Sequence, residues 1–253
     1  MNYFFFLSDN SFKCDLQIPK FKNNGFQNLD IRLYKATINA GYWLIDEVNC
    51  DEDSDFYYVS SEEENHDDIF FLALPSEIKS KKINKLIDYN SYTNTVPDFR
   101  ANLCMLNSQG GFSSYQSEYP YRMTLNRGSL VSSISTLLDK NVDDNFIFIK
   151  NIFHEPIKEH YFAYLVSKHE REVIKSYKIF SNSTNRISIS NNDISPDHYI
   201  VAKGFLGVPV YLCQNSKGHM SLEHTHPPHS NIKGKNQFKL VSNLRNELLK
   251  IIS

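Results

Sequence analysis

The second half of the chain is a series of short apolar runs separated by short polar turns, and this spacing restricts the fold more than any other feature. The runs are rich in Tyr, Phe, Ile and Val and have the length of β-strands: residues 145–153, 161–167, 172–180, 185–190, 198–205 and 207–213. The turns between several of them, such as SNSTN and SNND, are too short for the crossover that parallel neighbours need. We therefore expect antiparallel neighbours, arranged as a meander or a sandwich-like sheet.

Three segments carry helical signals. Residues 75–90 begin next to a serine that can cap a helix, and residues 128–140 place four apolar side chains at helical spacing: Leu130, Ile134, Leu137 and Leu138. Residues 236–253 have apolar side chains at intervals of three and four, which is the pattern of an amphipathic helix. We expect a few helices, of which the last is amphipathic and C-terminal.

Together these elements predict a single α+β domain over residues 1–253 that is predominantly antiparallel β. The length of 253 residues fits one large domain or two small ones, and the 41% of hydrophobic residues supply enough apolar side chains for a core. The alternative is a subdivision near residue 91. In that case residues 1–90 would form a β-rich part, and residues 91–253 would form a β-meander part that carries the candidate site.

The charge and hydropathy of the chain favour a soluble protein with small-molecule partners. Charged residues make up 22% and the net charge is −2, so there is no cationic excess for a nucleic-acid backbone. The opening MNYFFFLSDN has five apolar residues in a row and no cationic leader, which predicts a buried first strand and no export signal or membrane span. We expect a cytoplasmic protein with neither nucleic-acid nor membrane partners.

The four cysteines, Cys14, Cys50, Cys104 and Cys213, are scattered and form no CxxC pair. In a cytoplasmic chain such cysteines are expected to be reduced thiols and not disulfides.

Histidines are concentrated near the end of the chain, in KGHMSLEHTHPPHS at residues 217–230. If MSLEHTH is a strand, His224 and His226 point to the same face, and the two prolines that follow end the strand. The chain can then turn so that His229 returns toward the pair. Three neutral imidazoles in one pocket would suit zinc or another divalent transition metal, so the candidate metal ligands are His224, His226 and His229.

Two other roles for these histidines stay open. In a metal-free site, His224 or His226 would transfer a proton, because an unperturbed histidine titrates near neutral pH. Glu155, in the segment FHEPIKEHY, is then a candidate acid or base beside them. In the third interpretation the histidines only hydrogen-bond to loop carbonyls and have a structural role.

A second unusual stretch is NSQGGFSSYQSEYPYRM, residues 107–123, which combines aromatic rings with hydrogen-bonding side chains. Rings can stack on the apolar face of a sugar or nucleoside while polar groups bond to its edge. The candidate substrate-binding residues are Arg100, Phe112, Tyr115, Gln116, Tyr119 and Arg122. The alternative is a hairpin whose tyrosines pack against the core and whose arginines pair with carboxylates.

Two classes of function follow. The first is an enzyme, a hydrolase or transferase, acting on a polar small molecule such as a sugar or sugar nucleotide, with the histidine cluster as its metal site or acid–base centre. The second is a non-catalytic β-sandwich module that binds a carbohydrate or other ligand, or that serves in assembly. The substitution His226→Ala separates the two classes, because it abolishes turnover only in an enzyme of the first kind.

Overall fold

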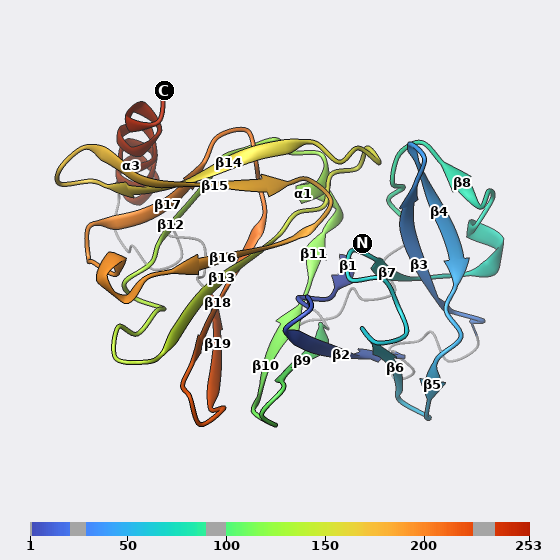
Figure 1. Cartoon of the computed structure of the whole chain (residues 1–253). Helices are drawn as coiled ribbons and strands as arrows, with labels where there is room; N and C mark the ends of the chain where they lie inside the picture. Colours follow the sequence, from blue (N-terminus) through green and yellow to red (C-terminus); the bar gives the residue numbers. More distant parts are fainter. Residues whose placement is uncertain (1, 21–28, 90–99, 225–235) are drawn as a thin grey trace. The chain divides into compact units, whose positions relative to one another are not determined.

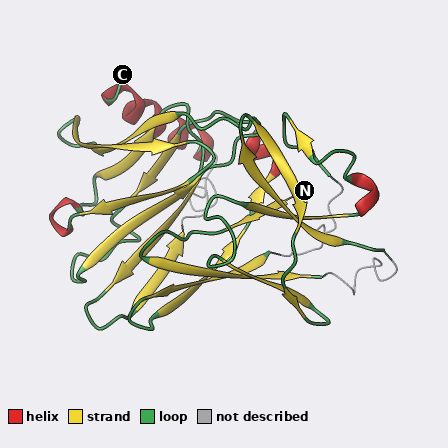
Figure 2. Cartoon of the chain, turned by 45° about the vertical axis from the view of Figure 1, so that its right-hand side comes forward, coloured by secondary structure: helices red, strands yellow, loops and turns green. Residues whose placement is uncertain are grey.

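The computed structural model describes residues 2–20, 29–89, 100–224 and 236–253, and these residues are predominantly antiparallel β with few helices (Figures 1 and 2). This confirms the main prediction of the fold class. The predicted C-terminal amphipathic helix is also confirmed, as α3 (Gln237–Ile251). The other helical elements of the described residues are short: α1 (Tyr121–Thr124) and two 3-10 turns, η1 (Pro75–Glu77) and η2 (Asn191–Asp193).

The chain divides into two compact units whose segments interleave along the sequence. Unit 1 contains residues 1–126, 152–158 and 182–184, and unit 2 contains residues 127–151, 159–181 and 185–253. The chain therefore returns to unit 1 twice after first leaving it. The alternative boundary near residue 91 lies outside the described residues.

Unit 1 holds two antiparallel sheets. The first has the order β11-β1-β7-β3-β4-β8. Its strands are β11 (Tyr119–Pro120), β1 (Asn2–Phe5), β7 (Ile69–Ala73), β3 (Arg32–Asn39), β4 (Tyr42–Glu47) and β8 (Lys82–Ile83). The predicted buried first strand is confirmed, because the side chains of Phe4 and Phe5 are fully buried.

The second sheet of unit 1 has the order β10-β9-β2-β6-β5. Its strands are β10 (Phe112–Ser117), β9 (Ala101–Asn107), β2 (Phe12–Pro19), β6 (Phe56–Ser60) and β5 (Asp51–Glu52). In β2, buried residues alternate with exposed ones over FKCDLQI, so one face of the sheet packs on the core and the other faces solvent.

Unit 2 holds two four-stranded sheets, with orders β12-β17-β14-β15 and β16-β13-β18-β19. The first contains β12 (Leu130–Ser133), β17 (His198–Ala202), β14 (His160–Ser167) and β15 (Glu172–Phe180). The second contains β16 (Thr184–Ile189), β13 (Asp144–Lys150), β18 (Val208–Gln214) and β19 (Met220–His224). All six predicted strands of the second half are present, and β13, β14, β15, β17 and β18 pair antiparallel with neighbouring strands. The strands that the structure describes fall into four sheets that do not follow sequence order, so the prediction of one meander or sandwich-like sheet is wrong.

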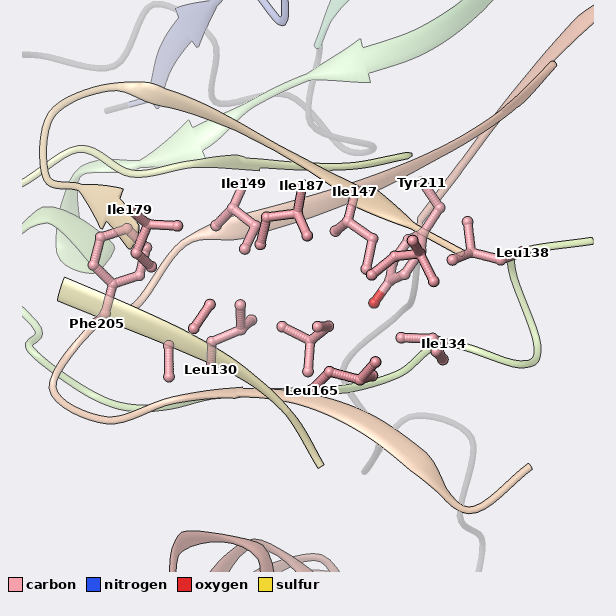
Figure 3. Packing of buried hydrophobic residues seen from close by; sticks show 14 residues of the cluster. Leu130, Ile134, Leu138, Ile147, Ile149, Leu165, Ile179, Ile187, Phe205 and Tyr211 are labelled. Atoms are coloured by element: carbon pink, nitrogen blue, oxygen red, sulfur yellow. The ribbon is translucent and has the colours of Figure 1, made fainter. Parts of the chain in front are cut away.

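Apolar side chains from both sheets of unit 2 form one core (Figure 3). Ile147, Ile187 and Tyr211 come from the sheet with β13, whereas Leu130 and Leu165 come from the sheet with β14. On the opposite face of the latter sheet, α3 adds a smaller cluster of buried residues: Val166, Val201 and Leu248.

The predicted helix at residues 128–140 is wrong, and a strand begins there instead. In β12, Leu130 and Ser132 are buried while Val131 and Ser133 are partly exposed, which is the two-residue period of a strand. Ser132 hydrogen-bonds to the hydroxyl of Tyr211, a partner distant in sequence. The strand period could not be recognised from the apolar residues, because one of the buried positions is the polar Ser132. The apolar residues alone also fit a helical spacing.

The predicted helix at residues 75–90 is wrong as well. Among residues 75–89 only η1 is helical, and residues 82–83 then pair as β8 with β4, where Trp43 pairs with Ile83. Leu86 is buried, and its backbone N–H donates to the carbonyl of His154. Tertiary contacts therefore override the helix propensity of this lysine-rich segment.

The four cysteines are free thiols, as predicted. None of the helices that the structure describes has the length and apolar character needed to cross a membrane.

Candidate functional site

Of the three histidines of the predicted site, His224 alone belongs to the described residues. The segment MSLEH forms β19, and its last residue, His224, faces Val210 of β18. His226 and His229 lie outside the described residues, so the predicted metal site stays a prediction. Among the residues that the structure describes, no three His, Cys, Asp or Glu side chains are grouped so that they could hold a metal ion.

Glu155 lies in a loop of unit 1 and is half-buried. Its carboxylate is 3.8 Å from Nζ of Lys85 and 3.9 Å from Nε2 of His154. Its carbonyl accepts a hydrogen bond from Nδ2 of Asn182 at 2.8 Å. The loop is thus held by its backbone, and the catalytic role of Glu155 stays a prediction.

The structure separates the predicted substrate-binding residues into two groups. Tyr119 is fully buried and packs edge-on against Phe5, with ring centroids 6.4 Å apart. Tyr115 points to the same side of its sheet as the buried Leu103 with which it pairs, and burial raises the pKa of Tyr115 to about 12. Arg122 is exposed on α1. These three residues do not join the other predicted ones.

Arg100, Phe112 and Gln116, in contrast, share the solvent-exposed face of the sheet β10-β9-β2-β6-β5. We call the exposed side of its four longer strands the amide face. Strand register defines its members: Phe112, Ser114 and Gln116 on β10; Asn102, Cys104 and Leu106 on β9; Lys13, Asp15 and Gln17 on β2; Phe56, Tyr58 and Ser60 on β6. Arg100 and Glu118 continue β9 and β10 at one end of this face.

A row of carboxamides crosses the amide face. Gln116 pairs with Asn102, Asn102 pairs with Gln17, and Gln17 pairs with Tyr58, each on the neighbouring strand. Nδ2 of Asn102 donates to Oε1 of Gln17 at 3.4 Å. Neighbouring strands are about 4.8 Å apart, so the three carboxamides span about 10 Å.

The guanidinium of Arg100 fixes one end of this row. Its Nη1 donates to Oε1 of Gln116 at 2.7 Å, and its Nε lies 2.6 Å from Oε2 of Glu118. Glu118 also accepts a hydrogen bond from Nδ2 of Asn2 at 2.8 Å. Because its oxygen is occupied, the amide of Gln116 can present its two N–H donors outward.

Aromatic rings border the row at its other end. Tyr58 and Phe56 alternate along β6, with ring centroids 6.3 Å apart and planes inclined by 48°. The hydroxyl of Tyr58 donates to Oδ2 of Asp53 at 2.7 Å, which fixes the ring's position. Phe112 lies near the opposite corner of the face, with 69% of its surface exposed.

Asp15 and Cys104 face each other in the next row. Burial is the main cause of the raised pKa of Cys104, and the carboxylate of Asp15 adds to it. A raised pKa keeps the thiol protonated and unreactive, so Cys104 is no candidate nucleophile. The exposed carboxylate of Asp15 has no hydrogen-bond or ion-pair partner among the described residues, which leaves both its oxygens free to accept.

The cations on and beside the amide face are neutralised by neighbouring carboxylates. Arg100 pairs with Glu118, and Lys13 pairs with Glu62. At the β6 end, Nζ of Lys20 lies 2.7 Å from Oε2 of Glu52. The face therefore offers amides, a carboxylate, hydroxyls and rings, but no unpaired cation among its described residues. These groups suit an uncharged, hydroxyl-rich ligand and not an anion.

No family model, no curated protein and no solved structure matches this chain. The argument for a function therefore rests on this chain's own geometry.

The sequence did not identify two of the three carboxamides of the row, Asn102 and Gln17, nor the adjoining ring of Tyr58. Gln17, Tyr58 and Asn102 come from three segments separated by about forty residues each, and only strand register brings them together. The alternation in FKCDLQI was the one available signal, because it predicts that Asp15 and Gln17 share an exposed face.

A hollow of 810 Å³ in unit 2 is lined by charged groups that serve the fold. Oδ2 of Asp197 accepts hydrogen bonds from Oγ of Ser167 at 2.9 Å and from the backbone N–H of His169 at 3.2 Å. Lys168 lies 3.6 Å from Glu247 near the C-terminal end of α3, where a cation is favoured by the helix dipole. These contacts fix the β14–β15 turn and indicate no ligand.

Proposed function

We propose that the amide face of unit 1 binds a neutral carbohydrate, and that the protein acts as a carbohydrate-binding module. The observation that carries this proposal is the row of three carboxamides on adjacent strands, Gln116, Asn102 and Gln17, which ends at the ring of Tyr58. This corresponds to the non-catalytic class of function that the sequence allows.

The chemistry of the row fits sugar hydroxyls. Each hydroxyl both donates and accepts a hydrogen bond, and a carboxamide offers both functions within one planar group. Asp15 adds acceptors, and the ring of Tyr58 offers an apolar surface for the C–H face of a sugar ring. A row of about 10 Å is long enough for two linked sugar rings.

An exposed sheet face is polar in any case, because it meets water. The amide face differs in that its side chains bond to one another across strands, as Arg100 does with Gln116 and Asn102 with Gln17. Side chains that are already ordered lose less conformational entropy when a ligand binds. Such ordering favours a binding surface over a merely solvated one.

The test is a glycan-array screen of the full chain, followed by calorimetric titration of each glycan that binds. We expect at least one neutral oligosaccharide to bind, and we expect Gln17→Ala to weaken its binding about tenfold, because several hydrogen bonds are lost from a preorganised row. Gln109→Ala is the matched control, because Gln109 is exposed in the β9–β10 turn, away from the row.

Two outcomes would reject the proposal. One is that no neutral glycan binds to the folded protein. The other is that Gln17→Ala and Gln109→Ala bind glycans equally well.

The histidine-centred enzyme is a separate prediction with a separate test. Metal analysis of the untagged protein, with the double variant His224→Ala/His226→Ala beside it, tests the zinc site. A near-stoichiometric metal that disappears in the double variant supports that prediction, and its absence from both proteins rejects it.

A further inference from the structure

Unit 2 contains a pocket of 420 Å³ between the β12–β13 loop, residues 134–143, and the hairpin of β18 and β19. Its volume lies in the range of small-molecule sites, roughly 300 to 1,000 Å³. Six of its lining residues carry the argument: Leu137, Asp139 and Val142 of the loop, and Cys213, Met220 and Ser221 of the hairpin. None of them belongs to the amide face or to the predicted histidine site.

The loop wall of this pocket is fixed by the buried side chain of Asn145 on β13. Its Oδ1 accepts hydrogen bonds from the backbone N–H of Asp139 at 3.2 Å and from Sγ of Cys213 at 3.1 Å. Its Nδ2 donates to the backbone carbonyl of Asp139 at 2.8 Å and to Oδ1 of Asn191 at 2.9 Å. Asn191 donates from Nδ2 to the carbonyl of Val142 at 2.7 Å. The loop is thus held in place by side chains beneath it.

The hairpin wall is ordered by Asn215 in the turn between β18 and β19. Its Oδ1 accepts hydrogen bonds from the backbone N–H of Lys217 at 3.0 Å and of His219 at 3.1 Å. The backbone N–H of Ser216 donates to Oδ2 of Asp143, the last residue of the loop, and this bond links the two walls. A pocket whose walls are already ordered loses little conformational entropy when a ligand enters.

Apolar side chains offer contact surface inside the pocket. Leu137, Val142 and Met220 line it, and each is only partly buried. The thioether of Met220 favours contact with an aromatic ring, because sulfur packs well at ring edges. The thiol of Cys213 is bonded to Asn145, and burial raises its pKa, so it is a lining group and not a nucleophile. A ligand with an aromatic body therefore suits this surface.

The charge of the lining is negative. Among the described residues that line the pocket, Asp139 is the one carboxylate, and there is no lysine or arginine. Oδ1 of Asp139 accepts hydrogen bonds from the backbone N–H of Asn141 at 2.8 Å and from its Nδ2 at 2.9 Å, whereas Oδ2 has no partner among the described residues. Lys140 and Lys217 are exposed outside the lining. A preference for cations must therefore come from direct contact with Asp139.

We propose that this pocket binds a small aromatic amine, with its ring against Leu137, Val142 and Met220 and its ammonium group at Oδ2 of Asp139. An ammonium group brings N–H donors and a positive charge, and a charge-assisted hydrogen bond to a carboxylate uses both. An anionic ligand would be repelled by Asp139, and an aromatic ligand without a donor would leave Oδ2 without a partner. The site lies in unit 2, so it is independent of the proposed carbohydrate site of unit 1.

The experiment follows isotope-labelled methionine methyl groups by NMR in the full chain. The sequence has four methionines, Met1, Met105, Met123 and Met220, and of the described ones Met220 alone lines the pocket. Loss of one signal in Met220→Leu assigns the reporter. The probes are phenethylamine, phenethyl alcohol and phenylpropionate, which share a phenyl ring and differ in charge. Methylammonium has the charge without the ring.

Two variants test the two parts of the pocket. Asp139→Asn removes the charge and keeps an oxygen that can accept from Asn141. Its matched control is Asp9→Asn in unit 1, because Oδ1 of Asp9 likewise accepts from the backbone N–H two residues on, at 2.8 Å from Ser11. Ser221→Trp fills the pocket from an exposed lining position. Circular dichroism melts check that each variant folds.

We expect phenethylamine to shift the Met220 methyl signal saturably, with a dissociation constant of about 1 mM, while Met105 and Met123 stay in place. Phenethyl alcohol should bind about three- to tenfold more weakly, and phenylpropionate more weakly still. Asp139→Asn should lose the preference for the amine over the alcohol, whereas Asp9→Asn should retain it. Ser221→Trp should abolish binding of all three phenyl probes.

Four results would overturn the proposal. The first is no saturable shift of Met220 with phenethylamine. The second is equal affinity for phenylpropionate, which would show that the pocket does not select a cation. The third is an equal affinity for methylammonium, which would show that the ring is not bound. The fourth is equal affinity of Asp139→Asn and Asp9→Asn for phenethylamine. If Asp139→Asn does not fold, the order of the phenyl probes on the wild type and their loss in Ser221→Trp decide in its place.

Discussion

Arg100, directly before β9, donates from Nη1 to Oε1 of Gln116 on β10 at 2.7 Å, which links the end of the carboxamide row to a side chain that is itself anchored by Glu118. One guanidinium thus orders two neighbouring strands at the surface. Its planar fork can contact both partners at once, which an ammonium group cannot do in the same geometry.

We predict that Arg100→Ala weakens ligand binding at the amide face by about three- to tenfold while lowering the free energy of unfolding by less than about 1 kcal/mol, because an exposed ion pair contributes little to stability. Arg100→Lys should retain the stability but not the affinity, since lysine can reach Glu118 without also ordering Gln116. Calorimetry and urea unfolding measure the two effects. Full affinity in Arg100→Lys would show that the order of Gln116 is irrelevant.

Asn182 is predicted to be among the more sensitive positions of unit 1. It is buried, its Oδ1 accepts from the backbone N–H of Phe153 at 2.6 Å, and its Nδ2 donates to the carbonyls of Glu155 and Ile157. Its φ is +52°, a conformation that costs most residues about 1 kcal/mol or more. Asn182→Ala should therefore lower the free energy of unfolding by about 3 kcal/mol, since unsatisfied buried groups cost about 1–3 kcal/mol each.

The control for this prediction is a pair of variants. Asn182→Gly loses the same side-chain bonds but tolerates positive φ, so it should be destabilised less than Asn182→Ala. Asn192→Ala, at an exposed position, should change little. Urea unfolding of all three gives the comparison, and equal midpoints for Asn182→Ala and Asn192→Ala would contradict the assigned role.

The sequence predicted those elements of the fold whose signals are local. The runs that became β14, β15 and β18 carry continuous or alternating apolar residues between turn-forming segments, and α3 repeats its apolar residues at helical intervals. The signals failed where a distant partner decides the conformation. Ser132 can be buried because its Oγ accepts a hydrogen bond from the hydroxyl of Tyr211. Residues 82–83 form a strand because they pair with β4.

The candidate site was predictable in part for the same reason. Phe112 and Gln116 lie four residues apart on one strand. Side chains an even number of residues apart point to the same face, so their shared face follows from the sequence. Tyr115, which lies between them in the alternation, points to the other face. The partners on β2, β6 and β9 could not be inferred, because register depends on which strands pair and by how many residues they are offset.

Gly207 is predicted to tolerate no side chain. A Cβ at this buried position would lie 2.8 Å from Cγ2 of Ile149 and 2.8 Å from the carbonyl oxygen of Lys150. Gly207→Ala should therefore lower the free energy of unfolding by about 1–3 kcal/mol, the usual cost of overpacking. Ser216→Ala, in an exposed turn, is the control, and an unchanged unfolding midpoint for Gly207→Ala would contradict the close approach of β13 to residue 207.

Asp197, which accepts hydrogen bonds from Ser167 and His169 at the turn between β14 and β15, should make the stability of the fold depend on pH in the acid range. Hydrogen bonds from the hydroxyls of Ser195 and Ser167 lower the pKa of Asp197 below its ordinary value. A lowered pKa in the folded state stabilises the fold above the unfolded-state pKa of about 3.9, and this contribution is lost as the pH falls below it. Asp197→Asn should be less stable than the wild type at pH 7, and the difference should shrink below about pH 4. Thermal melts across this range measure it, and a difference that is constant with pH would contradict the assignment.

The central claim is that the carboxamides of the amide face contact the sugar. The most direct test is to observe these carboxamides during titration with a glycan that the array identifies as a ligand. Nitrogen–proton NMR resolves the side-chain NH₂ groups of Gln17, Asn102 and Gln116, with Gln109 as an internal reference on the same sheet. The account predicts that the first three shift together and saturate at the dissociation constant measured by calorimetry, while Gln109 stays in place. Saturable glycan binding that leaves Gln17, Asn102 and Gln116 unchanged would place the ligand elsewhere and contradict the account.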